Sequence, residues 1–245
     1  MTYQTTFVVV LLLFAMLLTA CSNDRQTYFP LDPGTYWRYN IKSTTMDGME
    51  TKKYIIQVTQ PRDWQGESVP VRTTLAGMHV FYEQNDEGIF RIATRRHDQK
   101  TPTAVPDDRH TVLKYPLQPG TSWSEVAETI ALYRTGPPQR SEYWIHAPVK
   151  LKYVIEATDD SVKVPAGRFD NCLRVQATGR TPNYDAGNYI GRTDIIVDKT
   201  DWYAPGVGLV KSVRKETTTG KVLGREGMQT FAGGMVFELE EFERG

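Results

Sequence analysis

The chain has 245 residues, with 29 Lys and Arg against 29 Asp and Glu, so its formal net charge at pH 7 is +0. This balance lacks the basic surplus of nucleic-acid-binding proteins, and we expect no nucleic acid among its partners. Charged residues make up 24% and aromatic residues 11% of the chain, a composition that can bury a core and excludes a disordered protein.

The chain begins with an apolar leader. Phe7 to Leu18 is an unbroken apolar run of 12 residues, which is the length of a signal-peptide core. A membrane span would need ~20 such residues. We therefore predict a signal peptide over residues 1–20, although Met1 to Thr6 lack the Lys or Arg that such leaders usually carry.

The four residues that close the leader, Leu18-Thr19-Ala20-Cys21, resemble the bacterial lipobox. In lipoproteins the Cys of this motif becomes the new N-terminus and carries fatty acyl chains such as palmitate. The resemblance implies lipidation at Cys21, a tether over residues 21–27 and an anchor in the membrane of the cell envelope. Ser22 in place of Asp implies sorting to the outer membrane, facing the periplasm. An ordinary signal peptide that happens to end in Ala-Cys is the alternative.

Cys172 is the other cysteine, and lipidation of Cys21 leaves it without a partner in the chain. An exported protein with one such thiol either offers it for chemistry or buries it. We interpret Cys172, in the expected strand 169–177, as a small buried hydrophobic residue, because free Cys is among the most often buried residue types.

The sequence after the leader contains an internal repeat. Tyr115 to Trp123 matches Phe29 to Trp37 at six of nine positions, and weaker matches follow in the same order. We predict a duplicated β unit within one compact domain. The predicted divisions are 28–112 for the first unit, 113–219 for the second, and 220–245 for C-terminal strands. The alternative is that β proteins reuse Pro-Gly turns and aromatic strands without any duplication.

Most segments between turns alternate apolar and polar residues, the period of half-buried strands, and none after residue 21 has convincing helical periodicity. We therefore predict an all-β protein with a large antiparallel sheet, either a half-barrel or a two-sheet sandwich. The expected strands include 50–60, 69–75, 78–84, 128–134, 142–146 and 190–198, and 97–112 is expected to be a loop.

Three motifs carry a further resemblance that covers most of the mature chain. They are the Leu-x-Pro-Gly-x-x-Trp phrase, Val164 to Val175, and Trp202 to Lys211. These segments resemble motifs that recur in uncharacterised bacterial envelope lipoproteins. The resemblance implies a fold and a compartment but no mechanism.

The sequence offers no recognisable catalytic or metal-binding motif. Its four histidines share no metal-ligand spacing, and neither HExxH nor a paired CxxC occurs. We therefore predict no catalytic residue, no metal and no cofactor. The candidate ligand-facing aromatic residues are Trp37, Trp123, Trp202 and Tyr203, with packing in the core as the alternative.

Together these observations favour a non-catalytic, membrane-anchored lipoprotein that binds an apolar ligand or assembles with an envelope protein. Two alternatives stay open. An envelope hydrolase could bring carboxylates or histidines together through folding alone, and a structural envelope component would need no ligand.

Overall fold

The computed structural model describes residues 27–245, except 46, 137–140, 187–190 and 223–224. The predicted signal peptide, the lipobox and residues 21–26 of the predicted tether lie outside these described residues. Within the described ranges, no helix is long and apolar enough to cross a membrane.

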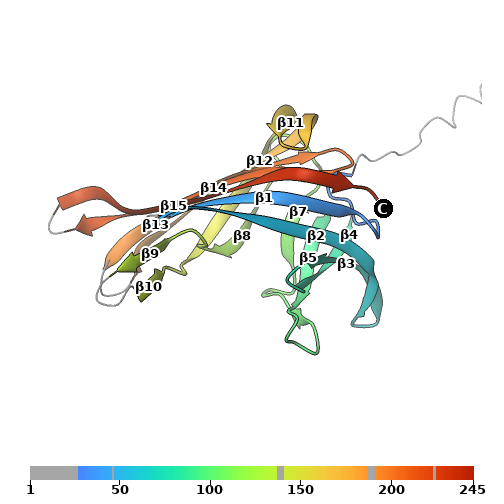
Figure 1. Cartoon of the computed structure of the whole chain (residues 1–245), viewed down its shortest axis with the longest axis horizontal. Helices are drawn as coiled ribbons and strands as arrows, with labels where there is room; N and C mark the ends of the chain where they lie inside the picture. Colours follow the sequence, from blue (N-terminus) through green and yellow to red (C-terminus); the bar gives the residue numbers. More distant parts are fainter. Residues whose placement is uncertain (1–26, 46, 137–140, 187–190, 223–224) are drawn as a thin grey trace, which may run out of the picture.

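The protein is all-β, as the alternating pattern predicts, and it is dominated by one antiparallel sheet of 13 strands (Figure 1). The sheet order is β6-β5-β4-β3-β2-β1-β15-β14-β13-β12-β11-β8, with β7 also paired to β5, while β9 and β10 form a separate hairpin. The strands are β1 (Tyr36–Thr45), β2 (Gly48–Trp64), β3 (Glu67–Thr74), β4 (His79–Asn85), β5 (Gly88–Arg95), β6 (Thr103–Ala104), β7 (His110–Lys114), β8 (Ser122–Glu128), β9 (Tyr133–Gly136), β10 (Ser141–Trp144), β11 (Pro148–Val164), β12 (Gly167–Asp185), β13 (Arg192–Ala204), β14 (Gly208–Val222) and β15 (Arg225–Glu243).

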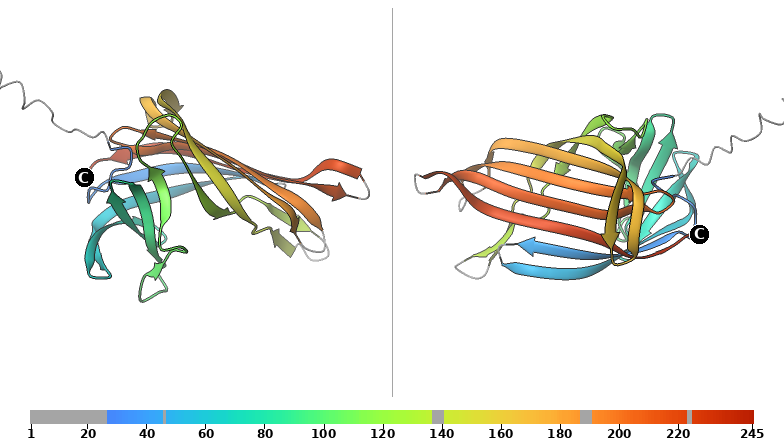
Figure 2. Two further views of the ribbon diagram at one scale, coloured as in Figure 1. Left: turned by 180° about the vertical axis from the view of Figure 1, so that it is seen from behind. Right: turned by 90° about the horizontal axis from the view of Figure 1, so that it is seen from above.

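The sheet curves strongly but does not close into a barrel. Figure 2 shows β3, β4, β5 and β7 turned beneath the long central strands, while β8, β9 and β10 cover another part of the same concave face. Among the described residues, no strand ladder joins β7 to β8. The Glu125 carboxylate of β8 instead accepts a hydrogen bond from the backbone N–H of Thr111 in β7 at 2.7 Å. The architecture is therefore an open, half-barrel-like sheet with a partly covered inner face.

The C-terminal strand β15 lies at the centre of the sheet, between β1 and β14. It runs antiparallel to both neighbours, with Ile41 opposite Phe237 on one side and Ser212 opposite Phe237 on the other. The last strand of the chain therefore joins the first strand of the predicted first unit to the last strand of the predicted second unit.

The two Pro-Gly turns of the sequence repeat have the same geometry. Gly34 and Gly120 take φ angles of 93° and 91°, which favour glycine. The Gly34 N–H donates to the Val58 carbonyl at 2.9 Å, and the Gly120 N–H donates to the Ile155 carbonyl at 2.9 Å. Each turn therefore hydrogen-bonds to the strand that neighbours its own, β2 for Gly34 and β11 for Gly120. The duplication itself stays a prediction.

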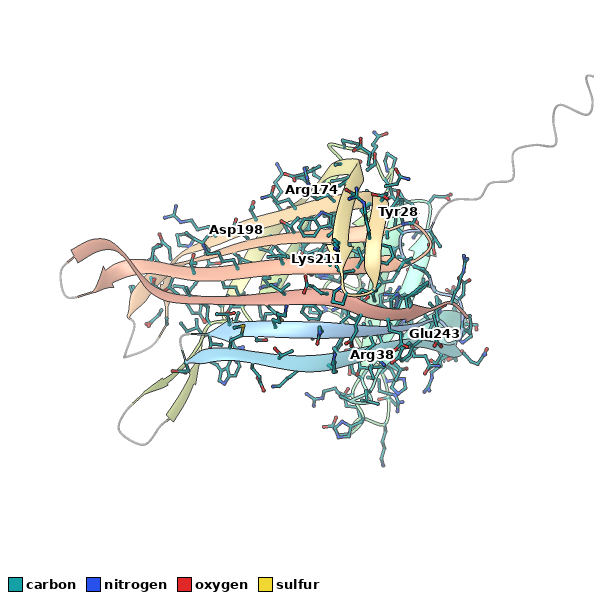
Figure 3. All side chains as sticks on the ribbon, turned by 45° about the horizontal axis from the view of Figure 1, so that its top comes forward. Tyr28, Arg38, Arg174, Asp198, Lys211 and Glu243 are labelled. Carbon is teal, nitrogen blue, oxygen red and sulfur yellow. The ribbon has the colours of Figure 1, made fainter. Side chains whose placement is uncertain are left out.

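The outer, convex face is polar. Arg38 of β1 donates to Glu240 of β15 at 3.0 Å, and Lys211 of β14 lies 3.0 Å from Glu238. Figure 3 shows Arg38, Arg174 and Lys211 on this surface. Because side chains alternate along a strand, this solvated face leaves the intervening residues to form the apolar inner face.

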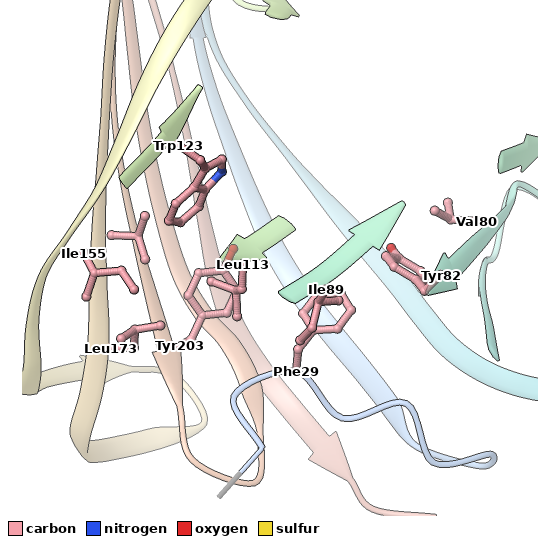
Figure 4. Close-up of a cluster of buried hydrophobic side chains, with 10 residues drawn as sticks. Phe29, Val80, Tyr82, Ile89, Leu113, Trp123, Ile155, Leu173 and Tyr203 are labelled. Atoms are coloured by element: carbon pink, nitrogen blue, oxygen red, sulfur yellow. The ribbon is translucent and has the colours of Figure 1, made fainter. Parts of the chain in front are cut away.

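Buried side chains form several clusters rather than one central layer. The cluster in Figure 4 joins Phe29, Leu113, Trp123 and Tyr203 with residues of β4, β5, β11 and β12. A second cluster contains Trp37, Tyr39 and Leu239 together with Cys172, whose side chain is fully buried. The interpretation of Cys172 as a buried hydrophobic residue is confirmed.

Two local predictions were wrong. The expected strand 128–134 is broken, because β8 ends at Glu128 and β9 begins at Tyr133. The expected loop 97–112 contains β6 and the start of β7, which pair with β5.

Candidate functional site

An apolar groove lies on the inner face where β1, β2 and β15 run beneath the β8–β9 connection, and it has a volume of about 740 Å³. The apolar and aromatic residues that line it are Ile41, Met49, Tyr54, Ile130, Ala131, Trp144, Met235 and Phe237, and the polar ones are Ser43, Thr45, Asp47, Glu50 and Lys52. This volume falls in the range of small-molecule sites, which is ~300–1,000 Å³.

Strand register brings the floor of the groove together. Ile41 of β1 is paired with Phe237 of β15, and Ser43 is paired with Met235, so their side chains share one face. Tyr54 of β2 meets Phe237 edge to face, with ring centroids 6.1 Å apart. The inner end of the groove is therefore aromatic and fixed by the sheet.

The mouth of the groove exposes large apolar side chains. The exposed fractions of Met49, Ile130 and Trp144 are 72%, 43% and 49%. Trp144 stacks on His146, with ring centroids 6.0 Å apart. Soluble proteins seldom leave several large apolar side chains together in water, so this opening is a candidate binding surface.

One wall of the groove is the crossing segment, residues 129–132, which connects β8 to β9. The fully buried Glu216 carboxylate accepts hydrogen bonds from the Ile130 N–H at 3.0 Å and the Ala131 N–H at 2.7 Å. Arg214 pairs with the same carboxylate at 2.5 Å and donates to the Glu128 carbonyl at 2.7 Å. A buried ion pair on β14 thus holds the crossing segment against the sheet.

Gly233 of β15 makes the close approach of this segment possible. A Cβ atom built on Gly233 would lie 1.8 Å from the Ala131 carbonyl oxygen. The absence of a side chain at Gly233 therefore lets the crossing segment lie directly on the strand.

A second polar region lies further along the inner face. Lys199 pairs with the buried Asp201 at 2.6 Å, and its ammonium lies 5.9 Å from the Tyr153 ring. Trp123 stacks on Tyr153 with centroids 5.2 Å apart. The Trp123 Nε1 and the Asp201 Oδ1 are buried without a hydrogen-bond partner among the described residues.

Glu125 also has a basic partner, since His110 Nδ1 lies 3.2 Å from its Oε2. Burial lowers the pKa of His110, and the charges of Arg91 and Lys199 act in the same direction, while Glu125 opposes them. His110 is thus biased toward its neutral form, in which it can still hydrogen-bond to Glu125.

The structure places the four predicted aromatic residues outside the groove. Trp37 is buried, and its Nε1 donates to the Val207 carbonyl at 2.7 Å. Trp123 and Tyr203 are buried in one cluster with Phe29. Trp202 is half-buried on the other side of β13 from Tyr203, and its Nε1 donates to Asp160 at 3.0 Å.

The groove residues were not predicted from the sequence. Ile41 belongs to a strand whose alternation is recognisable, but nothing local indicates that Phe237 and Ile130 share its cavity. Within the described ranges, no three His, Cys, Asp or Glu side chains gather in a way that could hold a metal ion.

Comparison with known proteins gives little beyond this geometry. No protein-family model and no curated protein matches the chain. Two solved structures are similar to it: a protein from Bacteroides fragilis described as exported and with a YmcC-like fold (16% identity, TM-score 0.36), and one from Parabacteroides distasonis described as a lipoprotein (17% identity, TM-score 0.38). Each alignment covers 88% of this chain and 98% of the other.

Proposed function

We propose that the protein is a lipid-anchored lipoprotein of the cell envelope that binds an alkyl-chain ligand in the groove without catalysing a reaction. The observation that carries the proposal is the groove itself, with its aromatic floor of Tyr54 and Phe237 and its exposed apolar mouth. The lipobox of the sequence supplies the anchor, and the outer membrane facing the periplasm is the proposed location.

An alkyl chain is the occupant that suits this shape. Ile41, Met235 and Phe237 give one side of the groove an apolar surface, so an alkyl chain lying there is favoured chiefly by removal of its apolar surface from water.

The position of the groove indicates where the ligand enters. The Thr27 carbonyl accepts a hydrogen bond from Gly206 at the end of the molecule where β1 begins. The groove mouth lies at the other end of β1, about 30 Å away at 3.3 Å per residue. Residues 22–27 can reach at most about 20 Å from a lipidated Cys21. In this proposal the mouth faces away from the anchored end, toward ligands delivered from the periplasmic side.

Photocrosslinking in living cells tests the binding role. A benzophenone amino acid at position 49 of the full chain is expected to capture alkyl lipids after illumination, which mass spectrometry of the purified protein would identify. The same substitution at position 75 is the matched control, because Leu75 is 81% exposed but does not line the groove. Equal lipid capture at both positions would contradict the proposal.

The anchor has its own test. Cys21→Ser should prevent lipidation and leave the signal peptide uncleaved by the lipoprotein peptidase, which a gel shift and radiolabelled palmitate would show. Normal palmitate incorporation in this variant would exclude Cys21 as the lipidated residue.

A further inference from the structure

Two cross-strand rows of the inner face run through the floor of the groove and continue beyond it. Register partners in an antiparallel sheet carry their side chains on the same face. The first row crosses β1, β15, β14 and β13, and its members there are Ile41, Phe237, Ser212 and Asp201. The second row lies beside it and reaches the edge strand β8 through Ala177 of β12; its other members are Ser43, Met235, Arg214, Lys199, Tyr153 and Trp123.

Both rows change from apolar to polar at the border between β15 and β14. Phe237 and Met235 line the groove on β15. Their register partners on β14 are Ser212 and Arg214, which are buried. Neighbouring strands are ~4.8 Å apart, so the polar part of each row begins one strand spacing from the apolar floor. The inner face is therefore amphipathic across the strands, as a lipid with a polar head group requires.

Asp201, on the polar side of the first row, has an unused hydrogen-bond acceptor. Its side chain is 4% exposed, and its Oδ2 lies 2.6 Å from Lys199 Nζ. The other oxygen, Oδ1, is buried without a hydrogen-bond partner among the described residues. A buried acceptor without a donor is costly, so this position favours a ligand group that donates a hydrogen bond.

Trp123, at the β8 end of the second row, has an unused donor. The residue is 7% exposed, and its Nε1 is buried with no acceptor in the part of the chain that the structure describes. Its ring stacks on Tyr153, and Lys199 Nζ lies 5.9 Å from the centre of the Tyr153 ring. Direct contacts therefore connect Trp123 to the pair of Lys199 and Asp201.

The charged side chains of the two rows are balanced. On β2 the rows end with Lys52 and Glu50. Each charged member has a partner of opposite charge: Lys199 with Asp201, Arg214 with Glu216, and Lys52 with Glu50. An anionic head group would have to compete with Asp201 for Lys199, and a cationic one with Lys199 for Asp201. Because breaking a buried ion pair is costly, the rows favour an uncharged head group.

We infer that the groove binds a single-chain lipid with an uncharged, hydroxylated head group, with hydroxyl groups at Asp201 and Trp123 and the alkyl chain over Phe237. This inference rests on the proposed function and names the class of ligand. A hydroxyl group both donates and accepts hydrogen bonds, so hydroxyl groups supply the donor that Asp201 lacks and the acceptor that Trp123 lacks. Glycerol or a sugar linked to one alkyl chain has this chemistry.

The test uses the full lipoprotein in vesicles of phosphatidylethanolamine, because detergent chains would compete for the groove. Monohexadecanoylglycerol and methyl hexadecanoate, each with a diazirine on the chain, are compared for photolabelling of the residues that line the groove. Wild type is expected to be labelled about tenfold more by the glycerol ester, as one or two additional net hydrogen bonds would produce. Unlabelled hexadecyl glucoside and unlabelled monohexadecanoylglycerol, added as competitors, distinguish a sugar from glycerol.

Trp123→Phe keeps a ring beside Tyr153 but removes the indole N–H. It should lower labelling by the glycerol ester several-fold and leave labelling by the methyl ester unchanged. Trp202→Phe is the matched control, because the Trp202 Nε1 donates to Asp160 instead, and this variant should keep the preference for the glycerol ester.

Asp201→Asn leaves Lys199 without its counter-charge. This variant should therefore shift labelling from the glycerol ester toward hexadecanoic acid that carries the same diazirine. Asp198→Asn, which changes an exposed residue of β13, should not shift it. Equal labelling of wild type by the two esters would show that water alone serves Asp201 and Trp123, and a preference that survives in both Trp123→Phe and Asp201→Asn would also overturn the head-group assignment. Labelling of the groove by none of the probes would overturn the proposed function as well.

Discussion

The buried carboxylate of Glu216 on β14 accepts a hydrogen bond from the Ala131 N–H at 2.7 Å and thereby fixes the wall of the groove to its floor. The two residues are 85 positions apart in the chain. Because Glu216 also accepts from Ile130 and pairs with Arg214, one carboxylate satisfies two backbone donors and one guanidinium in the interior. The shape of the groove therefore depends on a polar contact rather than on apolar packing alone.

Replacement of Glu216 by Gln should destabilise the protein markedly. The change leaves the Arg214 guanidinium buried without its counter-charge, and breaking a buried pair in this way costs about 3–5 kcal/mol. Urea unfolding followed by circular dichroism would measure the loss. Glu241→Gln is the control, since Glu241 pairs with Arg38 at 2.6 Å on the solvated outer face and should matter by about 0–1 kcal/mol. A Glu216→Gln variant as stable as wild type would mean that the buried pair does not hold the segment.

Replacement of Gly233 by Ala should displace the crossing segment. The new methyl group would meet the Ala131 carbonyl oxygen, which is backbone and cannot rotate away. Overpacking of this kind costs about 1–3 kcal/mol. Hydrogen exchange of the Ile130 and Ala131 amides should become faster in this variant. In Gly234→Ala, where the nearest atom is the Arg214 carbonyl oxygen at 3.3 Å, exchange should stay close to wild type. Unchanged exchange in both variants would show that the segment tolerates the methyl group.

The sequence predicts the class of fold well, because strand alternation and Pro-Gly turns are local signals. Trp37 and Trp123 follow the two Pro-Gly turns of the sequence repeat, and in the structure these turns dock in the same way. The break in the expected strand 128–134 has a cause that lies far away in the sequence and not in a local signal. Residues 129–132 have strand-like composition, but the Ile130 and Ala131 N–H groups donate to Glu216, far along the chain, instead of to a neighbouring strand.

The candidate site was beyond sequence reasoning for the same physical reason. Ile41 and Phe237 meet only because β15 inserts beside β1, and no local pattern specifies that pairing. The tryptophans that are most prominent in the sequence, Trp37 and Trp123, are buried in the structure. The aromatic residues that line the groove are Tyr54, Trp144 and Phe237.

Cys172 should resist thiol reagents in the folded protein. Burial raises the pKa of its thiol to about 11, and the nearby carboxylates of Asp160 and Asp170 act in the same direction, so the reactive thiolate is scarce at neutral pH. Iodoacetamide at pH 8 should modify Cys172 only after denaturant is added, as intact-mass spectrometry would show. Rapid modification without denaturant would contradict the buried, neutral thiol.

The raised pKa of the Cys172 thiol also predicts that the stability of the protein depends on pH. Between the ordinary thiol pKa of 9.0 and about 11, the unfolded chain loses the Cys172 proton while the folded protein keeps it. The unfolded state therefore binds fewer protons, and the free energy of unfolding falls as pH rises through this range. Cys172→Ala should be less stable than wild type at pH 7 but should lose less stability between pH 9 and pH 11. An identical slope in both proteins would show that the thiol does not titrate differently on unfolding.

Trp144 should report ligand binding directly. Its side chain is 49% exposed at the groove mouth, whereas Trp37 and Trp123 are buried. The fluorescence of Trp144 should therefore respond more strongly to a bound ligand than that of these two buried tryptophans. An alkyl chain that covers Trp144 removes water from the indole and should shift the fluorescence to shorter wavelength when hexadecanoic acid is added. Trp144→Phe should abolish the shift, while Trp64→Phe, which alters a half-buried residue in the cluster around Phe81, should preserve it. A shift that survives in Trp144→Phe would place the ligand somewhere other than the groove.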